Sequence, residues 1–227
     1  MKPLRILIAD DHEVVRHGVR ALLQSHEGWE ICGEAVDGRD AVEKASRLKP
    51  EVVILDIGMP NLNGLDAARE ILRDDPRTLI LILTIDESEQ VMREVLNAGA
   101  RGFLLKSDAA RDLVAAVEAL QRHRTFFTSK VAEIVLDGYL KGKDPSTIPT
   151  LTQDRLTRRE REVVQLLAEG KTTKEVASVL GMSIKMAETH RSNIMRKLNF
   201  HSVSQLVVYA VRNNIIQVVP STTKPMA

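Results

Sequence analysis

Apolar and polar residues alternate along the first half of the chain in a repeating strand–helix pattern. Unbroken apolar runs such as 52–55 and 79–83 have the length and the β-branched content of strands that are buried on both faces. Between these runs, apolar residues recur every three or four positions, which is the spacing of amphipathic helices. The predicted strands span 5–9, 30–35, 52–56, 79–84 and 102–105, and the predicted helices span 13–25, 38–48, 64–74, 88–98 and 108–122.

Five strand–helix repeats with short connections predict the fold class of this half. Parallel strands joined by crossover helices form an open sheet with helices on both faces. We therefore expect a doubly wound α/β domain with a five-stranded parallel sheet over residues 3–122. Residues 123–150 follow as a predicted linker, with a short helix at 130–140 and two Gly and two Pro between positions 138 and 150.

Residues 151–216 contain only helical patterns. Thr157 and Glu160 are spaced as a capping box that begins the first helix, and Gly181 is placed to end the second. A short helix, a Gly-containing turn and a longer basic helix predict a small all-α helix-turn-helix domain. The predicted helices span 158–168, 174–180, 184–198 and 202–213, and a flexible tail is predicted at 217–227.

The composition is that of a soluble globular protein, with 44% hydrophobic and 28% charged residues. The longest apolar runs are far shorter than the roughly 18 residues that a membrane span requires, so no membrane association is expected. The first strand begins too close to the N-terminus for a signal peptide. A single cysteine, Cys32, excludes an internal disulfide framework and favours a reducing cytoplasm.

The formal net charge of +1 conceals a difference between the two halves of the chain. Residues 1–150 carry 20 Lys and Arg against 25 Asp and Glu, a net charge of −5. Residues 151–227 carry 12 against 6, a net charge of +6. The second half is therefore the part expected to meet a polyanion, although charge alone leaves nucleic acid, a membrane surface and an acidic protein as alternatives.

Polar residues follow several predicted strands at the point where each strand ends. Asp10 and Asp11 end the first strand, Asp56 the third, Thr84 the fourth and Lys106 the fifth. In a parallel sheet these carboxyl ends lie at one edge, so the side chains are expected to converge. Three neighbouring carboxylates repel one another, and Mg²⁺ with its preference for oxygen ligands relieves that repulsion.

The same constellation suits phosphoryl transfer. A carboxylate beside the cation attacks a phosphoryl group and holds it as an aspartyl phosphate. Lys106 then pairs with one phosphoryl oxygen, and the Thr84 hydroxyl donates a hydrogen bond to another. A metal-free α/β domain whose acidic edge is merely solvated is the structural alternative.

The residues of the first half resemble the receiver domain of bacterial two-component response regulators, over about residues 3–122. This resemblance implies a flavodoxin-like fold and phosphoryl transfer from a sensor histidine kinase to Asp56. Phe103 occupies the position of the family's aromatic switch, which is expected to rotate inward. A receiver that keeps these residues but is never phosphorylated remains an alternative. The resemblance rests on Asp10-Asp11, on Asp56 followed by Met59-Pro60 and Gly64, and on Thr84 and Lys106.

The receiver resemblance also implies a ligand set for Mg²⁺. The family holds the cation directly by carboxylates and one backbone carbonyl, with a further carboxylate acting directly or through water. The corresponding ligands in this sequence are Asp10, Asp11, Asp56 and the backbone carbonyl of Gly58.

The second half closely resembles the LuxR-type output domain, in the segments 156–163, 170–177 and 190–198. The whole chain is thus similar to response regulators of the NarL/FixJ class. Double-stranded DNA is the implied partner, bound by a homodimer that forms on DNA or on phosphorylation, with RNA polymerase as a further partner. One departure is Met186-Ala187, where the family usually has Thr-Val.

The predicted DNA contacts lie on the second and third helices of the all-α domain. Lys and Arg side chains are expected to neutralise phosphates, while Glu188, Thr189 and Ser192 are expected to face base edges. The full set is Thr173, Lys174, Lys185, Glu188, Thr189, Arg191, Ser192, Arg196 and Lys197.

Two other classes of function were weighed. An interaction module would use the first domain only for protein contacts, with a basic domain that binds no specific DNA. An enzyme would need a catalytic constellation that the sequence lacks, since no Gly-rich phosphate loop or GxSxG segment is present. His12 and His17 are five residues apart and do not share a helix face, which excludes a zinc-protease motif. The sequence therefore predicts a transcription regulator that is not an enzyme.

Overall fold

The computed structural model describes residues 2–127 and 156–217. The chain divides into two compact units, residues 1–154 (unit 1) and residues 155–227 (unit 2). The predicted short helix at 130–140, the Gly- and Pro-containing segment up to 150, and the tail from residue 218 lie outside the described residues.

Unit 1 contains a five-stranded parallel sheet with the strand order β2-β1-β3-β4-β5, as the sequence predicted. The order reverses between β1 and β3, and this is the position where open α/β sheets form their ligand crevice. The paired residues Ala9 and Leu55 bring the ends of these two strands side by side. The strands are β1 (Leu4–Ala9), β2 (Trp29–Ala35), β3 (Val52–Asp56), β4 (Leu79–Thr84) and β5 (Gly102–Leu105).

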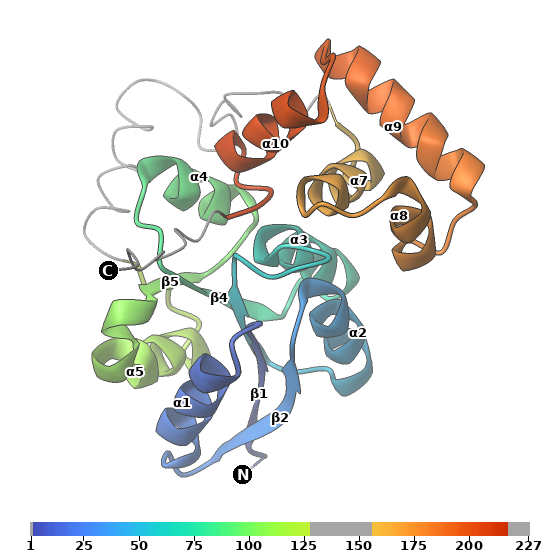
Figure 1. Cartoon of the computed structure of the whole chain (residues 1–227). Helices are drawn as coiled ribbons and strands as arrows, with labels where there is room; N and C mark the ends of the chain where they lie inside the picture. Colours follow the sequence, from blue (N-terminus) through green and yellow to red (C-terminus); the bar gives the residue numbers. More distant parts are fainter. Residues whose placement is uncertain (1, 128–155, 218–227) are drawn as a thin grey trace, which may run out of the picture. The chain divides into compact units, whose positions relative to one another are not determined.

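Helices cover both faces of the sheet (Figure 1). Alternate residues of β3 belong to different cores, because successive side chains of a strand point to opposite faces. Val53 and Leu55 pack with α2, α3 and α4, whereas Val52 and Ile54 pack with α1 and α5. The helices are α1 (Glu13–Gln24), α2 (Gly38–Leu48), α3 (Gly64–Asp74), α4 (Glu89–Asn97) and α5 (Ala109–Gln121), with a short 3₁₀ turn η1 (Lys106–Asp108) before α5.

The packed part of unit 1 continues beyond the end that the sequence suggested. After α5 the chain returns to the edge of the sheet, where Phe126 forms a bridge with Gly102. The Phe126 carbonyl accepts the N–H of Phe103 at 2.9 Å, and the Phe126 N–H donates to the Arg101 carbonyl at 3.0 Å. Phe126 packs on one core and Phe127 on the other. Residues up to Phe127 therefore belong to the packed unit, although we had placed them in the linker.

Unit 2 is a helical unit around one apolar core. Thr157 and Glu160 form the predicted capping box at the start of α7, each side chain bonding to the backbone of the other residue. Gly181 follows α8 with a φ of +61°, a backbone conformation that favours glycine. The helices are α7 (Arg158–Ala168), α8 (Thr173–Val179), α9 (Ile184–Leu198) and α10 (Val203–Arg212).

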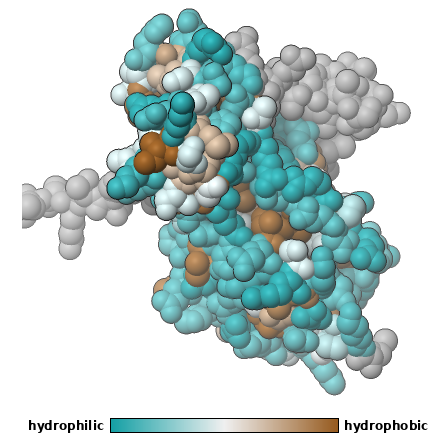
Figure 2. Space-filling model, turned by 90° about the vertical axis from the view of Figure 1, so that its right-hand side faces the viewer, coloured by the Kyte–Doolittle hydropathy of each residue, from teal (hydrophilic) through white to brown (hydrophobic). Residues whose placement is uncertain are grey.

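The surface is mainly hydrophilic and carries separate apolar patches (Figure 2). The exposed large apolar side chains of unit 1 are Val14, Val36 and Ile85, and those of unit 2 are Val179, Ile184, Met186, Val203 and Val208. Over residues 2–127 and 156–217, every helix is too short or too polar to span a bilayer.

Candidate functional site

The carboxyl edge of the sheet in unit 1 gathers charged side chains around one lysine. The ammonium of Lys106, at the end of β5, lies 2.7 Å from an oxygen of Asp10 and 3.0 Å from an oxygen of Asp56. Both carboxylates are nearly inaccessible, with 2% of Asp10 and 4% of Asp56 exposed. Lys106 therefore forms a buried bridge between the ends of β1 and β3, which confirms the predicted convergence for these three residues.

The second oxygen of Asp56 is held by the loop that follows it. The backbone N–H of Gly58 donates to this oxygen at 3.1 Å. Gly64 begins α3, and its N–H donates to the Ile57 carbonyl at 3.0 Å, closing the β3–α3 loop on itself. The loop thus returns to the strand end and brings the Gly58 backbone beside the Asp56 carboxylate.

Asp11 differs in exposure and in partner from Asp10 and Asp56, the other two carboxylates of the predicted ligand set. Its carboxylate is exposed, and one of its oxygens lies 2.8 Å from Nδ1 of His12. His12 also contacts Asp10, through its backbone N–H at 2.8 Å and through Nδ1 at 3.3 Å. The ligand atoms of Asp10, Asp11 and His12 lie within 4.8 Å of one another, close enough to hold one metal ion. Sequence reasoning had assigned no role to His12 beside the acidic pair.

Burial changes the acidity of Asp56. Desolvation by burial is the largest cause that raises the pKa of its carboxyl, Lys106 opposes it, and repulsion from Asp10 and Asp11 adds to it, which together bring the pKa to about 6. Without an added cation, the negative charge on Asp56 is thus poorly stabilised. An oxygen-preferring divalent cation compensates such a charge, and a carboxylate-rich donor set with one backbone carbonyl fits Mg²⁺.

Thr84 ends β4 opposite Leu105, the residue before Lys106, and both Thr84 and Phe103 are fully buried. The Thr84 hydroxyl oxygen accepts the N–H of Asp86 at 3.2 Å, so it is bonded to its own loop. The ring of Phe103 lies in the core formed by α2, α3 and α4. The backbone of Phe103 pairs with β4 on one side and with Phe126 on the other. Its predicted inward rotation on switching stays a prediction.

The raised pKa of Asp56 predicts a pH-dependent stability in buffer without divalent cations. A shift from 3.8 to about 6 corresponds to about 3 kcal/mol, at about 1.4 kcal/mol per pKa unit. The protonated carboxyl stabilises the fold fully below the unfolded pKa, and this contribution is lost as the pH rises through 6. Asp56→Asn, which mimics the neutral form, is therefore expected to raise the free energy of unfolding at pH 8 by up to about 3 kcal/mol.

Urea unfolding of both proteins between pH 4.5 and pH 8 tests this prediction, and the advantage of Asn should grow with pH. Asp75→Asn is the matched control. A hydrogen bond from Arg77 lowers the pKa of Asp75, so the neutral amide is expected to bring no gain at pH 8. Equal stability of wild type and Asp56→Asn at pH 8 would contradict the assigned cost of the buried charge.

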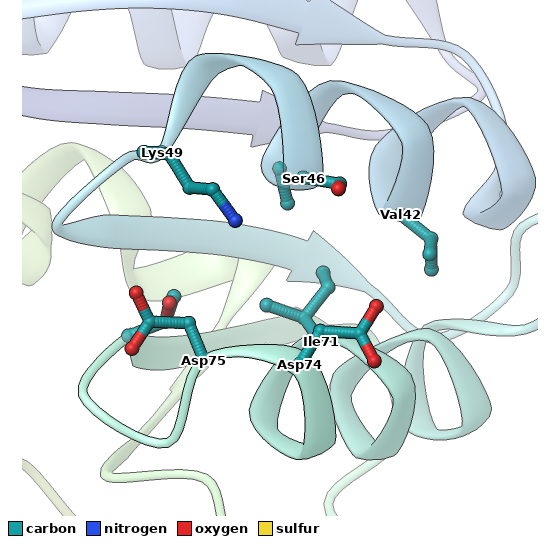
Figure 3. A pocket seen from close by; sticks show the side chains of 8 residues that line it. Val42, Ser46, Lys49, Ile71, Asp74 and Asp75 are labelled. Atoms are coloured by element: carbon teal, nitrogen blue, oxygen red, sulfur yellow. The ribbon is translucent and has the colours of Figure 1, made fainter.

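A hollow in unit 1 lies between α2 and α3 (Figure 3). Val42, Ser46 and Lys49 line it from one helix, and Ile71 and Asp74 from the other. Lys49 caps the C-terminal end of α2, at the edge where the strands begin, opposite Asp10 and Asp56. The hollow contributes no side chain to the acidic edge, so the candidate site lies at the carboxyl ends of the strands.

In unit 2, α8 and α9 pack as the two helices of a helix-turn-helix. Val176, Ala177 and Leu180 share a buried core with Ile194, and Leu198 packs against its margin, as predicted. The Ser183 hydroxyl accepts the N–H of Met186 at 3.2 Å, which fixes the start of α9. This packing leaves one side of α9 to solvent.

The predicted DNA contacts differ in how accessible they are. Arg191 is half-buried and donates to the Thr173 hydroxyl at 3.3 Å, linking α9 to the start of α8. Lys197 lies 2.8 Å from a carboxylate oxygen of Glu160, which joins the end of α9 to the cap of α7. These residues therefore hold the helices together. Seven predicted residues are exposed: Lys174, Lys185, Glu188, Thr189, Ser192, Arg196 and Lys197.

Met186 and Ala187, the two residues that depart from the usual sequence of the output domain, lie in different environments. Ala187 is fully buried in the core of unit 2, whereas Met186 is 53% exposed in the first turn of α9. Ala187 therefore affects packing, and Met186 affects the exposed face. The sequence alone had left both roles open for the pair.

Comparison with known proteins finds a family for each of the two units. Residues 6–118 match the response regulator receiver domain, and residues 154–210 match the LuxR family of bacterial regulatory proteins. The transcriptional regulatory protein LiaR of Bacillus subtilis (strain 168) is 37% identical over 215 residues, which cover 94% of this chain and 99% of LiaR. The chain belongs to the two-component response regulators with a LuxR-type output domain.

Solved structures of such regulators include complexes with DNA. The two-component response regulator RcsB in its DNA complex is 28% identical, with a TM-score of 0.56, covering 93% of this chain and 98% of that one. A structure of two RcsB dimers bound to two parallel DNAs has the same identity and a TM-score of 0.55, again covering 93% and 98%. The family consists of transcription regulators rather than enzymes, as the sequence predicted.

Proposed function

We propose that this response regulator is switched by phosphorylation of Asp56 by a sensor histidine kinase, and that its LuxR-type unit then binds promoter DNA. The observation that carries the proposal is the buried bridge from Lys106 to Asp10 and Asp56. This bridge brings together the carboxylate that would act as the nucleophile, a second carboxylate and the positively charged ammonium of Lys106. The structural alternative is a metal-free domain whose acidic edge is merely solvated. Such an edge requires no buried lysine between two carboxylates.

In the proposed reaction, an oxygen of Asp56 attacks the phosphorus of a phosphohistidine in the kinase. The P–O bond forms as the P–N bond breaks, and the leaving imidazole takes up a proton from solvent. The product is an acyl phosphate with about one more negative charge than the free carboxylate. Lys106, which already lies 3.0 Å from Asp56, pairs with the new phosphoryl oxygens.

A divalent cation completes this site. Asp10, Asp11, Asp56 and the carbonyl of Gly58 would hold Mg²⁺, which supplies positive charge to the carboxylates and to the transferring phosphoryl group. The exposed carboxylate of Asp11 and the backbone of Gly58, which contacts the Asp56 carboxylate, suit this role.

The proposed switch begins at Thr84. Its oxygen accepts a hydrogen bond from the Asp86 N–H, and its hydroxyl hydrogen is free to turn toward a phosphoryl oxygen. Such a turn draws the β4–α4 loop toward Asp56. Phe103 then acts as a fixed buried support for this loop, and the equilibrium between two loop positions is what phosphorylation shifts.

For unit 2 we propose a major-groove contact through α9. Lys185 and Arg196 would neutralise phosphates, and Glu188, Thr189 and Ser192 would face base edges. Thr173 and Lys174 lie at the start of α8 and would contact the sugar-phosphate backbone of the DNA. Arg191 and Lys197 would also neutralise phosphates, in addition to their contacts within the unit.

The proposed partners follow from these two sites. A homodimer on DNA places two copies of α9 in successive half-sites, and RNA polymerase is a further partner. Both DNA and the kinase's phosphohistidine place the protein in the cytoplasm. We propose domain limits of 3–122 for the receiver, 123–150 for the linker and 151–216 for the DNA-binding domain, with the receiver's packing extended to Phe127.

A gel shift tests the two halves of the proposal together. The full chain is incubated with acetyl phosphate and Mg²⁺ and mixed with the DNA upstream of its own gene. A shift that strengthens on phosphorylation supports the proposal. Phosphorylated protein that retards this DNA no better than a scrambled sequence would favour the rival class, an interaction module without specific DNA binding.

Lys185→Ala is expected to weaken DNA binding without changing sequence preference. Removing one phosphate contact reduces the slope of log K against log salt by about 1 and weakens binding similarly for all sequences. Fluorescence anisotropy at several salt concentrations measures both quantities. Arg212→Ala removes the same charge from the end of α10, outside α8 and α9, and should leave the slope unchanged. Equal slopes for wild type and Lys185→Ala would remove Lys185 from the interface.

A further inference from the structure

The acidic pair at the end of β1 is supported by a charged cluster that contributes no ligand of its own. Arg16, in the second turn of α1, donates through Nη1 to the backbone carbonyl of Asp10 at 2.9 Å. The Nε of the same guanidinium lies 3.3 Å from a carboxylate oxygen of Glu34, near the end of β2. The other oxygen of Glu34 is bound by Arg20. Only 11% of the Arg16 side chain and 21% of the Glu34 side chain are exposed.

This contact fixes the peptide group that joins Asp10 to Asp11. The Asp10 N–H donates to the Ala35 carbonyl at 3.2 Å, so β2 holds the backbone on one side. Arg16 holds the carbonyl on the other side, and this carbonyl belongs to the peptide plane from which the Asp11 side chain departs. Asp11 is exposed and pairs with the likewise exposed His12, so the position of its backbone strongly affects where its carboxylate points.

We propose that Arg16 is a positioning residue for the divalent-cation site. Glu34, on the edge strand β2, anchors the Arg16 guanidinium, which in turn holds the peptide group between Asp10 and Asp11 in place. The inference rests on the proposed function, because it concerns the cation that this function requires. Partners of metal ligands commonly change metal affinity by about 10-fold or more when they are removed.

Electrostatics alone would act in the opposite direction. A cation near the site repels Mg²⁺, so removing Arg16 would strengthen binding if its charge were all that mattered. Arg16 and Arg20 share the carboxylate of Glu34, and the pKa of Glu34 is lowered because these two arginines outweigh the effect of burial. Glu34 therefore neutralises only part of the positive charge of the two arginines, and the electrostatic and positioning effects of Arg16 have opposite signs. Weaker Mg²⁺ binding after removal of Arg16 would show that the loss of its hydrogen bond to Asp10 is the larger effect.

The test measures Mg²⁺ binding to the unphosphorylated full chain by isothermal titration calorimetry. Arg16→Met keeps the aliphatic stem and is expected to raise the Kd for Mg²⁺ about 10-fold. Arg20→Met is the matched control, because Arg20 shares Glu34 but does not reach Asp10, and its Kd should stay within about twofold of wild type. Arg16→Lys, which keeps the charge and one donor, should lie between the two.

Phosphorylation by acetyl phosphate gives a second readout that a general loss of stability does not produce. In Arg16→Met, the Mg²⁺ concentration for half-maximal rate should rise with the Kd, while the rate at saturating Mg²⁺ stays near that of wild type. An unchanged or tighter Kd in Arg16→Met, or an equal loss in Arg20→Met, overturns the inference and leaves the proposed function intact. Wild-type protein that binds no Mg²⁺ overturns both.

Discussion

Asp56→Asn is expected to abolish phosphate incorporation from acetyl phosphate while the protein stays folded. An amide lacks the carboxylate oxygen that forms the acyl phosphate, so incorporation should fall from about one phosphate per chain to background. The fold should tolerate the change, because Asn has nearly the same shape and the buried carboxylate is costly at neutral pH. Intact-mass spectrometry measures the incorporation directly.

The matched control for this variant is Asp75→Asn. It also removes one carboxylate from unit 1, at an exposed turn where Asp75 pairs with Arg77. Its phosphate incorporation should equal that of wild type. Incorporation in Asp56→Asn at the wild-type level would refute the assignment of the phosphoacceptor, and the phosphorylation-dependent gel shift should disappear together with the phosphate.

Gly64→Ala is expected to cause the largest loss of stability among single-methyl changes near the site. A Cβ at this position would lie 1.9 Å from the carbonyl oxygen of Asp56 and 3.1 Å from the Cα of Ile57. Both are backbone atoms of the strand end that carries Asp56, so the strand or α3 must move. We expect the free energy of unfolding to fall by about 2–4 kcal/mol and the rate of phosphorylation to fall with it.

Gly18→Ala is the control for this variant, because it adds the same methyl group inside α1. Nothing lies within 4 Å of a Cβ at Gly18, so alanine should stabilise the helix by about 0.5–1 kcal/mol. Urea unfolding of the two variants should therefore shift in opposite directions. A Gly64→Ala protein within about 0.5 kcal/mol of wild type would show that the close approach at Asp56 relaxes without cost.

The pattern of apolar positions was sufficient to predict the architecture of unit 1. Each strand ends where its apolar run stops, so the sequence also placed Asp10, Asp56 and Lys106 at the same edge. The distances from Lys106 to the two carboxylates, 2.7 and 3.0 Å, confirm this convergence. The prediction succeeded because strand periodicity and parallel connectivity are local or topological properties, which a sequence records directly.

Side-chain partners were not predictable from the sequence, for one reason. Phe103 is buried, and its backbone pairs with Phe126 across 23 positions of sequence. Lys197 contacts Glu160 at the start of another helix, while its proposed contact with DNA stays a prediction. In both cases the deciding contact joins segments that are distant in the sequence.

The sequence by itself determined the five-stranded parallel sheet, the helix-turn-helix and the edge at which the charged residues gather. Only the tertiary structure decided that Lys106 bridges Asp10 and Asp56, that Asp11 pairs with His12, and that Arg16 links Asp10 to Glu34. Periodicity fixes which face a side chain occupies, because it follows from backbone geometry. The choice of partner depends on distances of a few ångströms between separate elements, and those distances exist only after the sheet and its helices have packed.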